Sequence, residues 1–345
     1  MANERYVVNS ATDAVALNTD KMLFKTLQER FFIKGDGMAL ALQEVLKCFE
    51  KPSFFEEAIK QLADKYSERS LKKLIRFLIE KHLLIEYDEY ERLLKHDVSY
   101  LEKTFFYSAW GKPLQQIFDE LKILQIGIVG THQITNHLFT YLADSRLLKN
   151  FQVGITDDDT EIASQLNSVE VMNYDVYNKP QNIQKIIENC DYIFAASNYN
   201  DHRFFTQINV LCYDDVKNWM RIVNNGYEAE VGPIFKPGKT CCYACLLKRK
   251  DVKVVDEEYI FNDLYKKQIT QMDSNEKALK FSTFYPLNSI SANIACTETI
   301  KFFAGVKTNL MNQVLLINGM NYHTQTDYIY KDYKCPVCIE GCYIA

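Results

Sequence analysis

Residues 123–148 read ILQIGIVGTHQITNHLFTYLADSRLL, and this stretch decides the class of fold. It opens with an unbroken apolar run, which is typical of a strand buried on both faces of a parallel sheet. The rest carries apolar side chains at helical spacing. Strand-like segments at residues 151–159 and 191–198 flank a helical segment at residues 181–190. This alternation predicts an α/β domain with a mostly parallel sheet from residue 121 to residue 345.

The composition favours a cytoplasmic globular protein. The 345 residues are 47% hydrophobic and 25% charged, and this length suggests more than one domain. A net charge of −5 makes nucleic acid an unexpected partner. The first residues, MANERYVVNSATDAV, do not resemble a secretory signal, and no apolar run is long enough for a membrane span. We therefore expect no membrane partner, and cysteines kept reduced in the cytosol.

Residues 1–90 are predicted to form a separate module. Four short segments rich in branched and aromatic residues predict strands, and three helical segments follow at residues 38–50, 53–66 and 67–86. Ser53 and Glu56 have the spacing of a capping box at the start of the second helix. Strands followed by three short helices predict a winged-helix-like module, or else a small structural domain. Residues 91–120 are expected to be a linker with one helix.

The turn after the first strand of the α/β domain is poor in glycine. Ligands of such sheets bind at the carboxyl ends of the strands, where glycines let a phosphate approach the backbone. Gly130 is present, but His132, Gln133 and Thr135 stand where further glycines are expected. The second strand ends in Asp157, Asp158 and Asp159, which could hold a ribose hydroxyl or Mg²⁺. An ordinary solvated turn explains the acidic run equally well.

Two CxxC pairs are the most specific signal in the chain. Cys242 and Cys245 lie in FKPGKTCCYACLLKRK, and Cys335 and Cys338 lie in YKCPVCIEGCYIA. Four thiolates in tetrahedral geometry predict a closed structural zinc site that ties the C-terminal tail to the middle of the domain. A redox pair at each CxxC is the alternative. Cys241 and Cys342 lie beside the pairs and are alternative ligands.

Three segments together resemble the ThiF family of ubiquitin-activating-enzyme-like adenylyltransferases. They are PIFKPGKTCCYAC (residues 233–245), STFYPLNSISANIACTETIKFF (282–303) and YIYKDYKCPVC (328–338). The resemblance covers roughly residues 95–345 and implies a Rossmann-type domain with structural zinc at the CxxC pairs. It also implies that the second segment is a helix beside the nucleotide site.

The chain departs from the active members of that family. They carry an arginine and a lysine shortly after the acidic strand end, whereas this chain has no basic residue there before Lys179. They place an aspartate after a later strand, where this chain has Asn198. Asp157 and Asp159 fit the acidic pair of the family, but acids without a basic partner cannot neutralise ATP. We infer that the nucleotide site at Gly130 is degenerate and that adenylation is lost.

The N-terminal module resembles the recognition element of enzymes that modify ribosomally made peptides. In that family a leader peptide adds as a strand beside the third strand and lies against the third helix. The matching residues here are Phe31, Phe32 and Ile33 on the strand and Lys72, Lys73 and Arg76 on the helix.

The combined layout resembles the C-protein of thiazole/oxazole-modified peptide clusters, including streptolysin- and microcin-type bacteriocin systems. The resemblance implies a YcaO-family partner that binds ATP and cyclodehydrates Cys, Ser or Thr to azolines. This chain would bind the leader and activate the partner, without catalytic residues of its own. ThiF-like proteins are often dimers, so a homodimer is compatible with the resemblance. Two other hypotheses stay open: a self-sufficient peptide adenylyltransferase, and a zinc-stabilised interaction protein unrelated to peptide modification.

Overall fold

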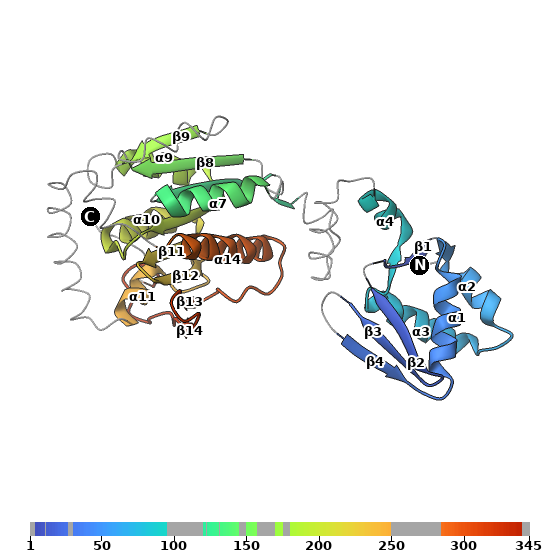
Figure 1. The fold of residues 1–345 in the computed structure, drawn as a ribbon. Coiled ribbons are helices and arrows are strands. Elements are labelled where there is room, and N and C mark those ends of the chain that lie inside the picture. The colour runs from blue at the N-terminus through green and yellow to red at the C-terminus, as the bar shows by residue number, and fades with distance from the viewer. Residues whose placement is uncertain are drawn as a thin grey trace. The chain divides into compact units, whose positions relative to one another are not determined.

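The chain divides into two compact units, Met1–Leu114 and Gln115–Ala345, which are described separately (Figure 1). The computed structural model describes residues 4–10, 12–26, 30–94, 120–121, 123–130, 132–144, 150–156, 170–174, 180–249 and 284–339. Most of the expected linker, at residues 95–119, lies outside this part of the chain.

The first unit contains two small antiparallel sheets and four described helices. Their order is β1 (Arg5–Val8), β2 (Asp13–Asn18), β3 (Lys21–Lys25), β4 (Arg30–Lys34), α1 (Met38–Cys48), β5 (Ser53–Phe54), α2 (Phe55–Leu62), α3 (Glu68–Glu80), β6 (Leu84–Glu86) and α4 (Tyr87–Leu94). One sheet has the order β5-β1-β6 and the other has the order β2-β3-β4. β2 and β4 are therefore the two edges of the second sheet.

Alternation along β3 and β4 gives the β2-β3-β4 sheet one apolar face. Met22 and Phe24 of β3 are buried, and Phe31 and Ile33 of β4 pack against the same core. Helices α1, α2 and α3 complete this core with apolar side chains from one face of each helix. The apolar periodicity of the sequence therefore located these helices. The winged-helix assignment itself stays a prediction.

The expected capping box at Ser53 is wrong. Ser53 belongs to the short strand β5, where it pairs with Tyr6 of β1, and its hydroxyl donates to the Lys51 carbonyl oxygen at 3.0 Å. Helix α2 begins two residues later, after Phe54, without a side-chain cap. Pairing with β1 therefore places Ser53 in a strand, although the local sequence predicted a helix cap. Ser67 does cap α3, because its side chain accepts a hydrogen bond from the Ser70 amide.

The second unit is built on one large sheet. Its elements are β7 (Gln125–Gly130), α7 (His132–Asp144), β8 (Asn150–Thr156), β9 (Glu170–Tyr174), α9 (Pro180–Asn189), β10 (Tyr192–Ser197), α10 (His202–Asp214), β11 (Asn218–Asn225), β12 (Glu228–Phe235), α11 (Tyr243–Arg249), α14 (Tyr285–Phe303), β13 (Gln313–Asn318) and β14 (Thr324–Tyr328). The prediction of an α/β fold is confirmed.

The sheet is mixed, with the order β14-β13-β12-β11-β10-β7-β8-β9. Strands β11, β10, β7, β8 and β9 run parallel, in agreement with the predicted mostly parallel sheet, although β9 was not among the expected strands. Strands β12, β13 and β14 extend the sheet as antiparallel neighbours, which the sequence pattern did not predict. The carboxyl ends of the parallel strands therefore share one edge of the sheet with the β11–β12 turn.

Helices cover both faces of this sheet. Helices α7 and α14 lie side by side on one face (Figure 1), and α14 also contacts β11 and β12. Side chains of α9, α10 and α11 fill the apolar cluster on the other face, where Trp219 stacks on Phe235 at 4.3 Å between ring centroids. Among the described residues, no helix has the length and apolar content needed to cross a bilayer.

Candidate functional site

A tight turn after β12 delivers the first cysteine pair. The turn is closed by the Thr240 hydroxyl oxygen, which accepts from the Lys236 amide at 2.7 Å. Gly238 has a φ of 76°, a conformation that glycine adopts without strain. Helix α11 starts directly afterwards, with Cys242 just before its first residue and Cys245 in its first turn. The Pro-Gly turn therefore fixes the position of both sulfur atoms.

The C-terminal arm, residues 329–339, brings the second pair to the same place. Asn312 connects the two segments: its carbonyl oxygen accepts from the Ile329 amide at 2.8 Å, and its side-chain oxygen accepts from the Cys241 amide at 2.8 Å. At the end of the arm, the Tyr213 hydroxyl donates to the Cys338 carbonyl oxygen at 3.4 Å. The arm is thus held against both the α11 segment and α10.

The four sulfur atoms form a compact cluster of the kind that holds a metal. All lie within 4.8 Å of one another, and all four residues are buried. The Sγ–Sγ distances are 3.5 Å from Cys242 to Cys335, 3.5 Å from Cys245 to Cys338 and 3.8 Å from Cys242 to Cys245. A tetrahedral zinc site with Zn–S bonds of about 2.3 Å requires sulfur–sulfur edges of about 3.8 Å. The cluster therefore fits a four-thiolate metal centre with no open position.

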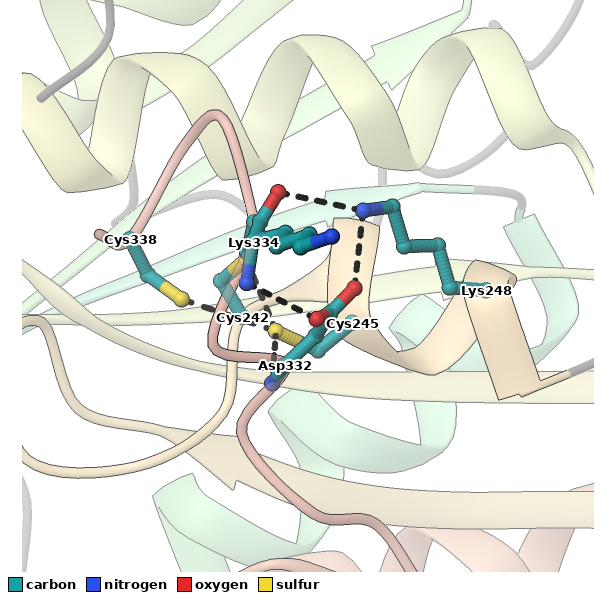
Figure 2. A network of polar contacts seen from close by, with 7 residues as sticks. Cys242, Cys245, Lys248, Asp332, Lys334 and Cys338 are labelled. Atoms are coloured by element: carbon teal, nitrogen blue, oxygen red, sulfur yellow. Dashed lines mark hydrogen bonds and ion pairs between the residues drawn. The ribbon is translucent and has the colours of Figure 1, made fainter. Parts of the chain in front are cut away.

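Polar groups beside the cluster suit thiolate ligands (Figure 2). The Asp332 amide donates to the Cys245 sulfur at 3.4 Å. Hydrogen bonds from the Cys242 thiol and then from backbone amides lower the pKa of Cys245 well below its usual range, against the effect of burial. Lys248 forms an ion pair with Asp332 at 2.7 Å, and this contact first, then the nearby Cys335 and Cys245, raises the pKa of its ammonium. This cation offsets part of the negative charge of a four-thiolate centre.

The remaining cysteines near the cluster do not share its geometry. Cys241 is buried but is not a member of the group, and burial raises the pKa of its thiol to about 12. Cys342, the other alternative ligand, lies outside the described residues. All described cysteines are free thiols, and the 3.8 Å between Cys242 and Cys245 is far longer than a disulfide bond of about 2 Å. The geometry favours metal ligation over a redox pair.

Gly130 of the predicted nucleotide turn has a packing role. A Cβ at this position would lie 2.1 Å from the carbonyl oxygen of Ala196 in β10. The close approach of β7 and β10 therefore requires glycine whether or not a phosphate binds. Asp157 and Asp159 lie outside the described residues.

The start of α7 turns its polar side chains toward α14. The Gln133 side-chain oxygen accepts from the Asn288 amide at 3.0 Å, and Asn224 of β11 donates to both the Asn288 oxygen and the Ser291 hydroxyl. Thr135 is fully buried, and its hydroxyl has no hydrogen-bond partner within the described part of the chain. These side chains, with α14, occupy the edge of the sheet where a nucleotide would be expected. The side chain of His132 lies outside the described set.

Sequence reasoning missed a buried polar network that follows β10. Asp201 is buried at the start of α10, accepts from the Phe204 amide at 3.1 Å and from the Tyr199 hydroxyl at 2.9 Å, and has its pKa raised by burial. The Nδ1 atom of the next residue, His202, forms a hydrogen bond with the Tyr243 hydroxyl at 2.9 Å. Tyr243 lies between the two cysteines of the first CxxC, so this network connects the sheet edge to the four-cysteine cluster. The sequence signal that could have revealed part of this network is Asp201, which precedes a helical run and is a typical N-cap residue.

Buried Arg221 extends the same network. Its guanidinium donates to Glu230 of β12 at 2.6 Å and to the Asn200 side-chain oxygen at 2.7 Å, and it lies 5.0 Å from the centre of the Phe205 ring. The charge of Arg221 is thus paired inside the domain. The arginine therefore joins the loop after β10 to β12.

Edge strand β4 and helix α3 form the predicted peptide-binding region of the first unit. Phe31 faces inward, stacking on Phe24 at 5.4 Å and meeting Phe77 of α3 edge-on at 6.2 Å between ring centroids. The Lys81 ammonium lies 5.3 Å from the centre of the Phe31 ring. Phe32 faces the other way and is 50% exposed, while Ile33 is partly buried like Phe31. The C-terminal end of α3 therefore reaches the inner side of Phe31 through Phe77 and Lys81, while α1 is the helix that packs on β4.

The predicted basic residues of α3 lie on different sides of the helix. Lys73 precedes Phe77 by one turn, so it shares the flank that faces Phe31. Lys72 forms an ion pair with Glu68 at 2.6 Å and also senses Glu56 of α2, which indicates the opposite flank. Arg76 is exposed and lies between the two lysines on the outer surface. The basic residue that the structure places on the Phe31 ring is therefore Lys81, at the C-terminal end of α3. Lys72 is engaged with Glu68 on the other flank.

The metal assignment predicts a selective loss. Cys242→Ala and Cys335→Ala should each reduce metal content from about one zinc per chain to nearly none, and should lower the unfolding free energy by roughly 4 kcal/mol or more. Cys241→Ala is the matched control, since this buried neighbour is not a ligand and the variant should keep its metal. Metal analysis of reduced protein and thermal unfolding provide the measurement. Zinc retained in Cys335→Ala, or absent from the unaltered protein, would contradict the assignment.

Comparisons with known proteins agree with this geometry. No curated protein matches the chain. The structure of E. coli MccB with AMPCPP and MccA has a TM-score of 0.74 at 17% identity, over 97% of this chain and 99% of that one. E. coli MccB with ATP has a TM-score of 0.70 at 18% identity, over 97% and 99%. The heterocyclase TruD has a TM-score of 0.64 at 14% identity, over 97% of this chain and 43% of that one.

At these identities the structural matches establish a shared fold. Residues 152–337, more than half of the chain, match the ThiF family. That match spans the parallel strands from β8 onward, the Cys242–Cys245 pair, α14 and most of the C-terminal arm. The chain belongs to the ThiF family.

Proposed function

We propose that this chain is the leader-peptide-binding subunit of an ATP-dependent peptide cyclodehydratase. In this function it binds the leader of a ribosomally made precursor and activates a YcaO-family partner, which binds ATP and converts Cys, Ser or Thr to azolines. The product class is a thiazole- or oxazole-containing bacteriocin or toxin. The observation that carries the proposal is that β4 is an edge strand among the described residues, with Phe77 at the end of α3 against its inner side.

Strand addition at β4 has a physical basis. An edge strand offers unpaired backbone N–H and C=O groups, which an extended peptide can satisfy while side-chain pockets give specificity. The inner side of β4 is bordered by Phe77 and Lys81 at the C-terminal end of α3, so an added strand would meet both apolar and basic groups. The similar structures support a peptide substrate, because MccB is bound there to MccA and TruD is a heterocyclase.

The sheet edge of the second unit supports a role without ATP chemistry. Asn288 of α14 donates to Gln133 at the start of α7 and accepts from Asn224 of β11, so these side chains are already engaged within the protein. Gly130 is explained by strand packing. We therefore assign ATP to the partner and a structural zinc ion to the four cysteines of this chain.

The alternative function is a self-sufficient peptide adenylyltransferase. It is favoured by the likeness over nearly the whole chain to E. coli MccB, whose structures contain ATP or AMPCPP. In this function the buried Asp201 and the acids after β8 would serve the nucleotide. Nucleotide binding by this chain alone separates the two functions.

Leader binding should depend on the side of α3 that is altered. Lys73→Glu should weaken binding of a labelled cognate leader by roughly 1–3 kcal/mol, because it places a negative charge beside the added strand. Arg76→Glu should have a smaller effect. Lys72→Glu is the matched control, with the same charge change on the opposite flank, and should change affinity by less than about 0.5 kcal/mol.

Fluorescence anisotropy with the full-length variants measures this order. Zinc content should be the same in all three, since the second unit is untouched. Equal leader affinities for Lys73→Glu and Lys72→Glu would refute docking between β4 and α3.

ATP should bind this chain weakly. We expect a Kd for Mg-ATP above about 1 mM by isothermal titration calorimetry, and no pyrophosphate exchange with the precursor peptide. ATP binding, and ATP-dependent loss of water from the precursor peptide, should appear when the YcaO partner is added. Micromolar ATP affinity or exchange by this chain alone would favour the adenylyltransferase instead.

A further inference from the structure

The outer face of the β2-β3-β4 sheet carries an apolar row between two basic rows. The strand register aligns Val15, Leu23 and Phe32 across the three strands. Val15 is 52% exposed and Phe32 is 50% exposed. An antiparallel sheet with one face on the core normally presents polar side chains on the other. The exposed apolar row therefore suggests a binding surface.

The flanking rows bring like charges together. Lys25 lies directly opposite Arg30, and Lys21 lies directly opposite Lys34. Like charges at directly opposed positions destabilise a sheet. The acidic residue that the described strands supply here is Asp13, at 3.9 Å from Lys25. An acidic ligand on this face would remove the repulsion that the protein itself leaves in place.

The basic rows end at the edge where a peptide would add. Arg30, Phe32 and Lys34 all point outward from β4, at alternate positions, and the Lys21 ammonium lies 4.1 Å from the centre of the Phe32 ring. Phe31 and Ile33 point inward, toward the core and α3. A strand added beside β4 would lie about 4.8 Å away, so its side chains would continue these rows on both faces.

From this juxtaposition we propose that β4 selects leaders with the pattern acidic–apolar–apolar–apolar–acidic. The two acidic side chains face Arg30 and Lys34 on the outer side, and the central apolar side chain extends the row Val15–Leu23–Phe32. The second and fourth side chains face inward beside Phe31 and Ile33. The pattern reads the same in both directions, so it holds for a parallel or an antiparallel added strand. The inference rests on the proposed leader-binding function and specifies its substrate class.

A displayed library of random twelve-residue peptides tests the pattern without knowledge of the precursor. The full-length protein should enrich peptides with two acidic residues four positions apart around an apolar residue. The variant Arg30→Glu/Lys34→Glu should instead enrich basic residues at these two positions. The control variant Lys51→Glu/Lys60→Glu has the same change in net charge on exposed sites elsewhere in the unit, and it should select the acidic pattern.

Affinities of the selected peptides complete the test. An acidic peptide should lose about tenfold in affinity for Arg30→Glu/Lys34→Glu, and a peptide with lysine at the two positions should recover it. Peptides that need Lys73 but show no acidic spacing would overturn this inference and leave the leader site standing. A selection without binders, or with binders indifferent to Lys73→Glu, would overturn both.

Discussion

The second unit depends on the meeting of four sulfur atoms contributed by segments far apart in the chain. Cys242 and Cys245 stand at the start of α11, while Cys335 and Cys338 stand on an arm that follows the edge strand β14. Because the four thiols are buried within 4.8 Å of one another, their mutual repulsion as thiolates is tolerable only around a cation. A metal there converts binding energy into folding energy and closes the long loop between the pairs. The hydrogen bond between Tyr243 and His202 then connects the cluster to the start of α10.

The two units offer opposite kinds of surface. The first presents an open strand edge with an exposed aromatic and unbalanced positive charge. The second has its sheet edge occupied by Gln133, Asn288 and Asn224, where Asn288 forms hydrogen bonds with both of the others. In the proposed function this contrast has a simple meaning. One unit captures a peptide, and the ThiF-type unit serves as a metal-stabilised scaffold for a partner that performs the ATP-dependent step.

Sequence reasoning succeeded where the signal is local. The apolar runs of β7 and β10 predict buried parallel strands without knowledge of their neighbours, and the CxxC spacing predicts ligands without knowledge of the fold.

Sequence reasoning failed where a residue distant in the chain determines the local structure. Ser53 pairs with β1 instead of capping a helix, and the hydrogen bond from Asn288 to Gln133 joins residues 155 positions apart. Likewise the flank of α3 that faces β4 could not be known, so Lys72 and Lys73 looked equivalent. Strand β12 was missed because Gly232 and Pro233 interrupt its buried run, and β14 because its residues TQTDY are polar and mostly exposed. Strand β13 carries the apolar run VLLI, which sequence reasoning left unassigned.

The central claim is that this chain holds a peptide and does not activate one with its own ATP. Hydrogen exchange on the full-length, metal-loaded protein tests it most directly, with the cognate leader in one sample and Mg-ATP in another. The account predicts that the leader slows exchange in β4 and α3, and that ATP leaves β7, α7 and α14 unchanged. Protection of β7 and α7 by ATP, without any protection of β4 by the leader, would contradict it.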